Sequence, residues 1–213
     1  MVIKKLILSA TLVALFSSAF AQEEQIYKSI ENSKEYIKNK DYRSAAGSLQ
    51  EAINRINDII GAQILAGLPK TSVGFNADMQ GDQVTSLGTM MGAGMVITRN
   101  YVDEKGRIMS IQITPNSPSL ESLNTFLDNP DTYGKDNDAG KSMKIGKFKA
   151  LFRFTKGEND ESSNGYLQMP FYTSVLVFQG SNFKTEEDFT NMVQSINFDN
   201  LAKAMGYVKE GEK

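Results

Sequence analysis

The sequence predicts an α+β fold, with an N-terminal antiparallel helical hairpin packed on a mainly antiparallel β-sheet that carries C-terminal helices. Before Pro69, apolar residues recur at three- and four-residue spacing, whereas after it they alternate with polar residues over short segments. The strand-like segments come in pairs joined by short turns, which is typical of antiparallel hairpins. The chain has 213 residues, 40% of them hydrophobic, which is enough for one sizeable core.

The first 21 residues have the three regions of a secretory signal peptide. Lys4 and Lys5 precede an apolar run from Leu6 to Phe16, and Ala19-Phe20-Ala21 supplies a cleavage site with small residues. The apolar run is shorter than the roughly 20 residues that a membrane-spanning helix needs. We therefore expect cleavage near Ala21, a periplasmic or secreted mature chain, and no transmembrane segment in that mature chain.

Residues 22–68 are predicted to form the helical hairpin, with amphipathic helices over 26–37 and 42–66. Gly67 and Pro69 end the second helix, and only a few residues separate the two helices, so an antiparallel arrangement is expected. The isoleucine face from Ile53 to Ile64 is longer than the first helix can cover. We therefore expect the hairpin to pack on the sheet domain, residues 69–213, so that 22–213 fold as one unit.

The sheet domain is predicted from its periodicity. Strand pairs are expected over 95–101 with 107–114, 142–145 with 148–154, and 166–169 with 172–179. The last of these strands is the most apolar, which predicts a place in the middle of the sheet. Helices are expected over 119–127, with Ser119 as N-cap, over 185–196, with Thr185 as N-cap, and over 200–207. We expect these helices to cover one face of the sheet.

The hairpin carries a local resemblance to a known repeat. Tyr42, Ala45, Leu49 and Ala52 stand at the spacing found in the second helix of a tetratricopeptide repeat, where small alanines allow close helix contact. Lys40 stands where that repeat prefers glycine, and no second copy follows. Because a solenoid needs at least three repeats, the resemblance implies a single repeat-like hairpin.

A second resemblance extends over most of the mature chain. Leu68-Pro69, then Gly74-Phe75, the strand pairs and the closing helix resemble a group of uncharacterised exported bacterial proteins that join a helical hairpin to a C-terminal α+β domain. In that group the Gly-Phe position is commonly Gly-Trp. By architecture alone, the domain is also similar to small α/β/α sandwich modules that accompany photosystems. Neither resemblance implies an activity.

Composition narrows the chemistry. The chain has no Cys, His or Trp, which excludes thiol nucleophiles, disulfides and histidine-based acid–base catalysis. Without Lys4 and Lys5, 21 basic residues stand against 25 acidic ones, and a chain of this charge is not expected to bind nucleic acid. We predict that the protein is not an enzyme and holds no cofactor.

Three local patterns suggest a metal, carboxylate or phosphate site, but a structural role explains each of them better. Met90, Met91 and Met95 offer thioether ligands for Cu(I), but methionine more often fills a core. The acidic pairs suit Ca²⁺ or a glycosidase, but solvated loop acids are the better interpretation: Asp128/Asp131, Asp136/Asp138 and Asp160/Glu161. The glycine-rich 88–94 segment lacks the lysine of a phosphate-binding loop. We predict no metal site and no catalytic residue.

Aromatic residues give the one predicted site. They concentrate in the C-terminal strands, and an apolar binding surface is predicted at four of them: Tyr166, Phe171, Tyr172 and Phe178. The sequence therefore favours an exported binding or accessory module of the cell envelope, whose partner is an envelope protein or a small amphiphile. A carboxylate-dependent hydrolase acting on envelope polymers and a structural or stress-related envelope protein are the alternatives.

The signal-peptide interpretation predicts that the mature chain begins at Gln22. Ala19 and Ala21 provide the small residues that the peptidase recognises, and charged residues follow at once. Mass spectrometry of the protein recovered from outside the cytoplasm should therefore show a chain without residues 1–21. A mass that retains them would contradict the export hypothesis.

Overall fold

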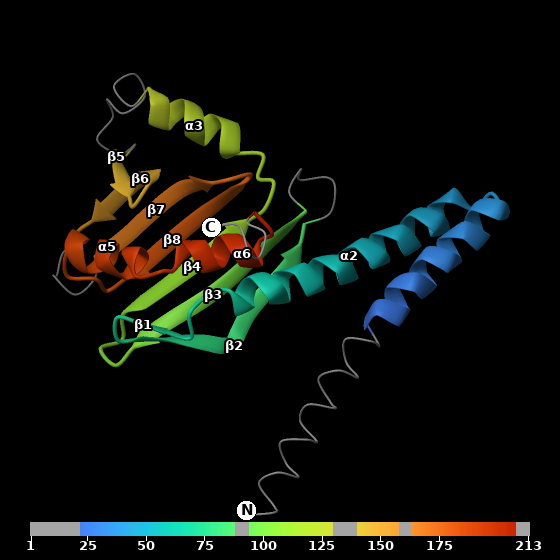
Figure 1. Ribbon diagram of the computed structural model, residues 1–213, viewed down its shortest axis with the longest axis horizontal. Helices are drawn as coiled ribbons and strands as arrows, with labels where there is room; N and C mark the ends of the chain where they lie inside the picture. Colours follow the sequence, from blue (N-terminus) through green and yellow to red (C-terminus); the bar gives the residue numbers. More distant parts are fainter. Residues whose placement is uncertain (1–21, 88–93, 130–139, 158–162, 208–213) are drawn as a thin grey trace, which may run out of the picture. The chain divides into compact units, whose positions relative to one another are not determined.

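The computed structural model describes residues 22–87, 94–129, 140–157 and 163–207, and these have an α+β fold (Figure 1). A helix over residues 22–38 and α2 (Tyr42–Ala66) come first, and an eight-stranded antiparallel sheet with further helices follows. The chain divides into two compact units, one ending at Ile59 and one beginning at Ile60, so the boundary lies within α2. Folding of 22–213 as one unit stays a prediction.

Small side chains form the interior of the first unit. Ser29 and Ser33 on the first helix and Ala45 and Ala52 on α2 are all less than 5% exposed. Lys40 joins the helices with a φ of 61°, the left-handed conformation for which the tetratricopeptide pattern uses glycine. The two consecutive helices of the expected hairpin are therefore present, and only a few residues separate them, as predicted.

The sheet confirms the three predicted strand pairs. Its order is β1-β2-β3-β4-β8-β7-β6-β5, and every neighbouring pair is antiparallel. The most apolar strand, β8, lies in the middle of the sheet, as predicted. The strands are β1 (Thr71–Ser72), β2 (Phe75–Ser86), β3 (Met95–Asp103), β4 (Ile108–Thr114), β5 (Lys141–Ile145), β6 (Phe148–Thr155), β7 (Asn164–Phe171) and β8 (Ser174–Ser181).

Strands β1 and β2 were not predicted from the sequence. In β2 only Phe75 is fully buried, and the pairing with β3 shifts register between Asp78 and Gln83. This irregularity breaks the alternation of apolar and polar residues on which strand prediction depends. The strand lies near one edge of the sheet, where exposed polar residues are well tolerated.

Helices cover both faces of the sheet, so the expectation that they cover one face was wrong. On β8, Leu176 and Phe178 belong to the main core with α5 (Glu186–Gln194) and α6 (Phe198–Ala204). Val175 and Val177 alternate with them and face the other way, where they pack in a smaller cluster with Leu123 of α3 (Leu120–Asp128). A central strand that is apolar on both sides requires cover on both sides.

The two predicted helix caps differ in chemistry. Thr185 precedes α5, and its side chain accepts a hydrogen bond from the Asp188 backbone N–H at 3.1 Å, as predicted. Ser119 precedes α3, but its side chain makes no capping hydrogen bond, because the hydroxyl is 3.0 Å from that of Ser117. Asn197 supplies an unpredicted cap for α6 and accepts from the Asn200 N–H at 2.9 Å.

Two glycines form a notch in the sheet that receives α5. Gly165 on β7 and Gly180 on β8 are direct partners across the strands. A Cβ added to either would lie 2.3 Å or 2.6 Å from the ring of Phe189, so only glycine allows this approach. The Phe189 ring is also 5.4 Å from that of Phe183. We call Gly165, Gly180 and Phe189 the glycine notch.

A buried arginine joins β3 to β2 and to the end of α2. The Arg99 Nε donates to the Asp82 carboxylate at 2.8 Å, and its Nη1 donates to the carbonyl of Leu65 at 2.8 Å. The bond to Asp82 raises the pKa of Arg99, although burial opposes the shift. Tyr101 donates to the Pro69 carbonyl at 2.8 Å, and burial raises the pKa of Tyr101 to about 12. These bonds tie β3 to the last turn of α2 and to the segment that follows it.

The glycine notch predicts a steric substitution effect. Gly180→Ala should lower the free energy of unfolding by about 1–3 kcal/mol, because the new methyl group overlaps the Phe189 ring. Phe189→Leu should cost less in the Gly180→Ala background than alone, since the smaller side chain frees space for the methyl group. Urea denaturation of the four proteins measures this coupling.

Gly94→Ala is the matched control, because a Cβ there meets no atom of the described residues within 4 Å. It should change the free energy of unfolding by less than about 0.5 kcal/mol. Additive effects of Gly180→Ala and Phe189→Leu would contradict the notch.

Candidate functional site

The structure brings three of the four predicted site residues together. Phe171 lies 5.1 Å from Tyr172 between ring centroids, and the Phe198 ring lies 6.0 Å from Phe171 and 6.4 Å from Phe178. Phe171 and Phe178 are fully buried in the core, whereas Tyr172 is 44% exposed. Of these three residues, therefore, only Tyr172 lies at the surface.

Tyr166 lies on the opposite face of the sheet. Its neighbours Gly165 and Leu167 point to the main core, so the alternation of β7 directs Tyr166 away from it. The Tyr166 hydroxyl donates to Gln168 Oε1 at 3.2 Å, and the Arg153 guanidinium lies 5.9 Å from its ring centroid. Burial raises the pKa of Tyr166. Tyr166 is therefore not part of the aromatic cluster.

Three further aromatic residues of the cluster, Phe148, Phe198 and Tyr207, were not among the predicted site residues. Tyr207 stacks on Tyr172 with centroids 4.5 Å apart and an interplanar angle of 15°, and Phe198 joins Phe171 to Phe148. The sequence does contain a signal for Phe198. Leu201 and Met205 follow it by three and seven residues, which is the spacing of one apolar helix face. The name aromatic cluster is used below for Phe148, Phe171, Tyr172, Phe178, Phe198 and Tyr207.

A groove opens beside this cluster, between the β5–β6 turn and the junction of α5 and α6. Its volume is about 390 Å³, within the range of small-molecule sites. Phe148 and Phe198 belong to both the groove and the cluster, and their centroids are 5.8 Å apart. The groove is lined by Ile145, Gly146, Lys147, Phe148, Ile196, Asn197, Phe198 and Asp199.

The groove combines an apolar floor with a polar rim. Ile145 and Ile196 are buried at 0% and 3% exposure, whereas Lys147 and Asp199 are exposed. The Lys147 ammonium lies 5.3 Å from the Phe148 ring centroid, a cation–π distance. The rim thus offers one charge of each sign beside the half-buried rings of Phe148 and Phe198, beneath which the two isoleucines are buried.

Tyr172 occupies a strained turn between β7 and β8. Its φ is 55°, a left-handed conformation that is rare for a bulky side chain. Tyr207 holds the turn, because its hydroxyl lies 2.8 Å from Thr173 Oγ1 and 2.8 Å from Ser174 Oγ. Strain of this kind persists only where surrounding contacts impose it, and it concentrates at binding and catalytic sites.

Three other cavities are less suited to an apolar ligand. One, of about 690 Å³, is lined by Lys105, Arg107, Asn182, Lys184 and Asp188. Its Arg107 is already engaged, because Nε donates to Asp103 Oδ2 at 2.7 Å and the guanidinium lies 4.9 Å from the Phe75 ring centroid. This cavity is charged and presents no aromatic side chain among its described lining residues.

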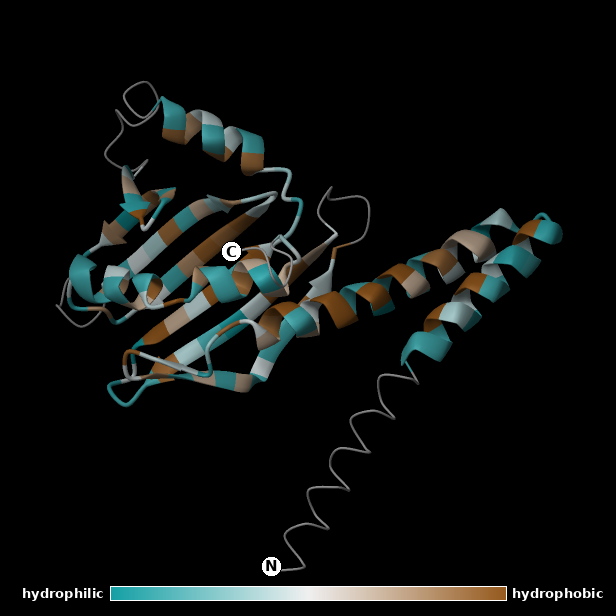
Figure 2. Cartoon of the chain, viewed as in Figure 1, coloured by the Kyte–Doolittle hydropathy of each residue, from teal (hydrophilic) through white to brown (hydrophobic). Residues whose placement is uncertain are grey.

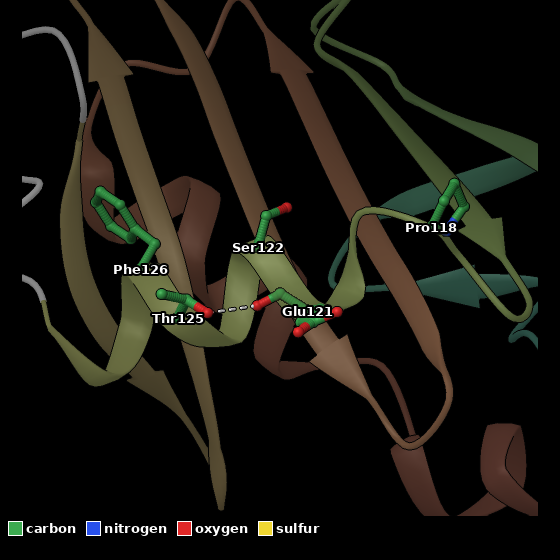
Figure 3. Close-up of a pocket in the computed structure, with 5 residues that line it drawn as sticks. All are labelled: Pro118, Glu121, Ser122, Thr125 and Phe126. Carbon is green, nitrogen blue, oxygen red and sulfur yellow. Dashed lines mark hydrogen bonds between the residues drawn. The ribbon is translucent and has the colours of Figure 1, made fainter.

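The remaining two cavities lie along α3, and Figure 3 shows one of them. Its volume is about 570 Å³, and the described residues that line it all come from one short segment: Pro118, Glu121, Ser122, Thr125 and Phe126. The Thr125 hydroxyl is occupied, because it donates to the Glu121 carbonyl at 2.9 Å. No second described element closes this cavity, so we take the groove beside the aromatic cluster as the candidate site.

The described residues offer little acid–base or metal chemistry. No group of three or more His, Cys, Asp or Glu among them could hold a metal ion. Hydrogen bonds lower the pKa of Asp41 and Glu51, through the side chains of Ser44 and Arg55 respectively. Burial raises the pKa of Asp103, but hydrogen bonds from Arg107 and Lys105 outweigh it, so the net shift is downward. None of these three carboxyl groups has the raised pKa of a general acid.

Several residues that the sequence offers as possible metal ligands or paired carboxylates lie outside the described residues. These are Met90, Met91, and five members of the acidic pairs, Asp131, Asp136, Asp138, Asp160 and Glu161. Met95 is described and is buried in the core at 5% exposure. Asp128 binds the Lys149 ammonium on the surface at 2.7 Å.

Comparisons with known proteins do not identify the chain. No protein-family model matches it, and no curated protein matches it. One solved structure, the extracellular domain of PknH from Mycobacterium tuberculosis, aligns with 70% of this chain and 89% of its own at 11% identity. The TM-score is 0.24, too low to indicate a shared fold. None of the described helices is both long and apolar enough to span a membrane.

The lowered pKa of Asp103 predicts loss of stability in acid. The ionised carboxylate accepts from Arg107 Nε and from the backbone N–H groups of Lys105 and Arg107. Because the pKa of Asp103 in the folded state is below the ordinary value, its contribution to the free energy of unfolding is full above about pH 5 and disappears as the pH falls through the folded pKa.

Asp103→Asn should therefore lower the free energy of unfolding at pH 7 and make its decrease in acid smaller, as measured by urea denaturation between pH 7 and pH 2. Asp58→Asn, at an exposed position of α2, is the control for the loss of one carboxylate and should change the free energy of unfolding at pH 7 by less than about 0.5 kcal/mol. An identical pH dependence for Asp103→Asn and the unsubstituted protein would contradict this account.

Proposed function

We propose that the protein is an exported accessory module of the bacterial cell envelope that binds a small amphiphile in the groove beside Phe148 and Phe198. One observation carries the proposal: the aromatic cluster continues from the buried Phe178 to the exposed Tyr172, and a groove of about 390 Å³ opens along it. Buried aromatic rings are rigid and contribute large apolar contact area, which suits them to holding an acyl chain or a ring.

Export is supported by the signal-peptide pattern of residues 1–21. An exported protein meets lipids, lipid-linked precursors and other amphiphiles of the envelope. A site without histidine or cysteine serves recognition better than proton transfer at neutral pH. Binding is therefore favoured over catalysis.

The lining of the groove indicates the kind of ligand. The half-buried rings of Phe148 and Phe198 offer apolar surface for one tail, and a volume of about 390 Å³ is small for the contact area of a protein partner. The rim carries Lys147 and Asp199, one charge of each sign, which suits a zwitterionic or uncharged polar headgroup. We therefore favour a small amphiphile over an envelope protein as the occupant.

The proposal predicts that Phe198→Ala weakens binding of dodecylphosphocholine below its critical micelle concentration. Removing the ring takes away the wall between the groove and the cluster, so the dissociation constant should rise at least about tenfold. Isothermal titration calorimetry measures the change, with circular dichroism as the check on folding.

Phe154→Ala is the matched control. Phe154 is half-buried like Phe198, but it lies on β6, where it stacks on Phe152, and it does not line the groove. It should bind the probe as the unsubstituted protein does. Absence of binding by the unsubstituted protein, or equal loss in both variants, would contradict the proposal.

A further inference from the structure

Helix α2 carries a row of large apolar side chains that the described structure leaves exposed. Tyr42, Leu49, Ile53 and Ile56 are 66%, 43%, 45% and 41% exposed. Ala46, also exposed, completes a heptad pattern in which every a and d position from 42 to 56 is apolar. We call these five residues the outer stripe. Figure 2 shows hydrophobic positions recurring along the length of α2.

A second stripe on the same helix is already occupied. Ala45, Ser48, Ala52 and Ile59 follow one another at intervals of three, four and seven residues and are buried or half-buried. The helix over 22–38 lies against this side, because Arg55 donates to the Gln25 side chain and Ser29 hydrogen-bonds Glu51. At 3.6 residues per turn, the two stripes are about a quarter turn apart. Within the first unit, the outer stripe is therefore an independent face.

Two such stripes are what a helix at the corner of a four-helix bundle needs, because it contacts one neighbour on each. The hairpin supplies only one neighbour. We propose that two copies of this chain associate through the outer stripes of their α2 helices, so that two hairpins complete a four-helix bundle and Ile53 and Ile56 pack on the second copy instead of on the sheet domain.

The occupant is assigned to a second copy by periodicity and charge. Knobs-into-holes packing requires a partner helix with the same repeat, over about 21 Å from Tyr42 to Ile56. The other helices after α2 in the described residues have nine, nine and seven residues, too few for this length. The positions that flank the outer stripe are Arg43, Ala45, Gln50, Ala52 and Asn57. With one charged residue among five, they neither repel an identical helix nor select an oppositely charged partner.

Sedimentation equilibrium of the purified protein, expressed from Met1, tests the proposal at concentrations from about 1 to 100 μM. A dimer is expected in this range. Ile53→Glu and Leu49→Glu should each raise the dimer dissociation constant about a hundredfold or more, because each dimer would bury the new charge twice. Circular dichroism verifies that the helices remain.

Gly47→Glu is the matched control for added charge. Gly47 is exposed on the other side of α2, and a Cβ there meets nothing within 4 Å. This variant should dimerise as the unsubstituted protein does. If the unsubstituted protein is a monomer at 100 μM, the outer stripe does not pair and the proposal is wrong. If the dimer persists in both the Ile53→Glu and the Leu49→Glu variants, another surface forms the dimer and the proposal is equally wrong.

Discussion

The close approach of α5 to the sheet, which two glycines allow, determines where the candidate site forms. Gly165 and Gly180 stand opposite each other on β7 and β8, and the ring of Phe189 occupies the space that their Cβ atoms would take. This contact fixes the height of α5 above the sheet. The chain then leaves α5 and passes through Ile196 and Phe198, which form one side of the groove. A helix held further from the sheet would separate these residues from Phe148 on the other side.

Within the aromatic cluster, the contacts of Tyr207 offset the backbone strain at Tyr172. The left-handed conformation of Tyr172 costs about 1–2 kcal/mol relative to ordinary backbone. Stacking on Tyr207 returns about 0.5–1.5 kcal/mol, and the two short contacts of the Tyr207 hydroxyl contribute about 1 kcal/mol each. The turn is therefore stable as a whole, although it holds an exposed aromatic ring that a glycine or asparagine turn would not present.

Local patterns were sufficient to predict much of the fold. The β3–β4 hairpin, the central place of β8 and the Thr185 cap follow from alternation, apolar content and capping chemistry within a few residues. Strand β2 was missed because its register shift interrupts the alternation, and the opposite placement of α3 was missed because periodicity does not tell which face of a sheet a helix covers. Sequence information within one strand or helix does not include such choices.

The site was predictable only in part, for the same reason. The concentration of aromatic residues identified Phe171, Tyr172 and Phe178, but alternation alone did not separate the buried members from the exposed one. The two tyrosines that stack, Tyr172 and Tyr207, are 35 positions apart, and the helix that brings Tyr207 to the turn is positioned by contacts across the core. Long-range packing, rather than local pattern, assembles the groove.

The most direct test of the account is to locate a bound amphiphile by NMR. Isotope-filtered nuclear Overhauser spectra of the labelled protein with unlabelled dodecylphosphocholine report which protein protons lie near the acyl chain. The account predicts contacts from the acyl chain to the ring protons of Phe148 and Phe198 and to the methyl groups of Ile145 and Ile196. Contacts confined to Phe126 on α3 or to Tyr166 on the opposite face would show that the groove is not the binding site.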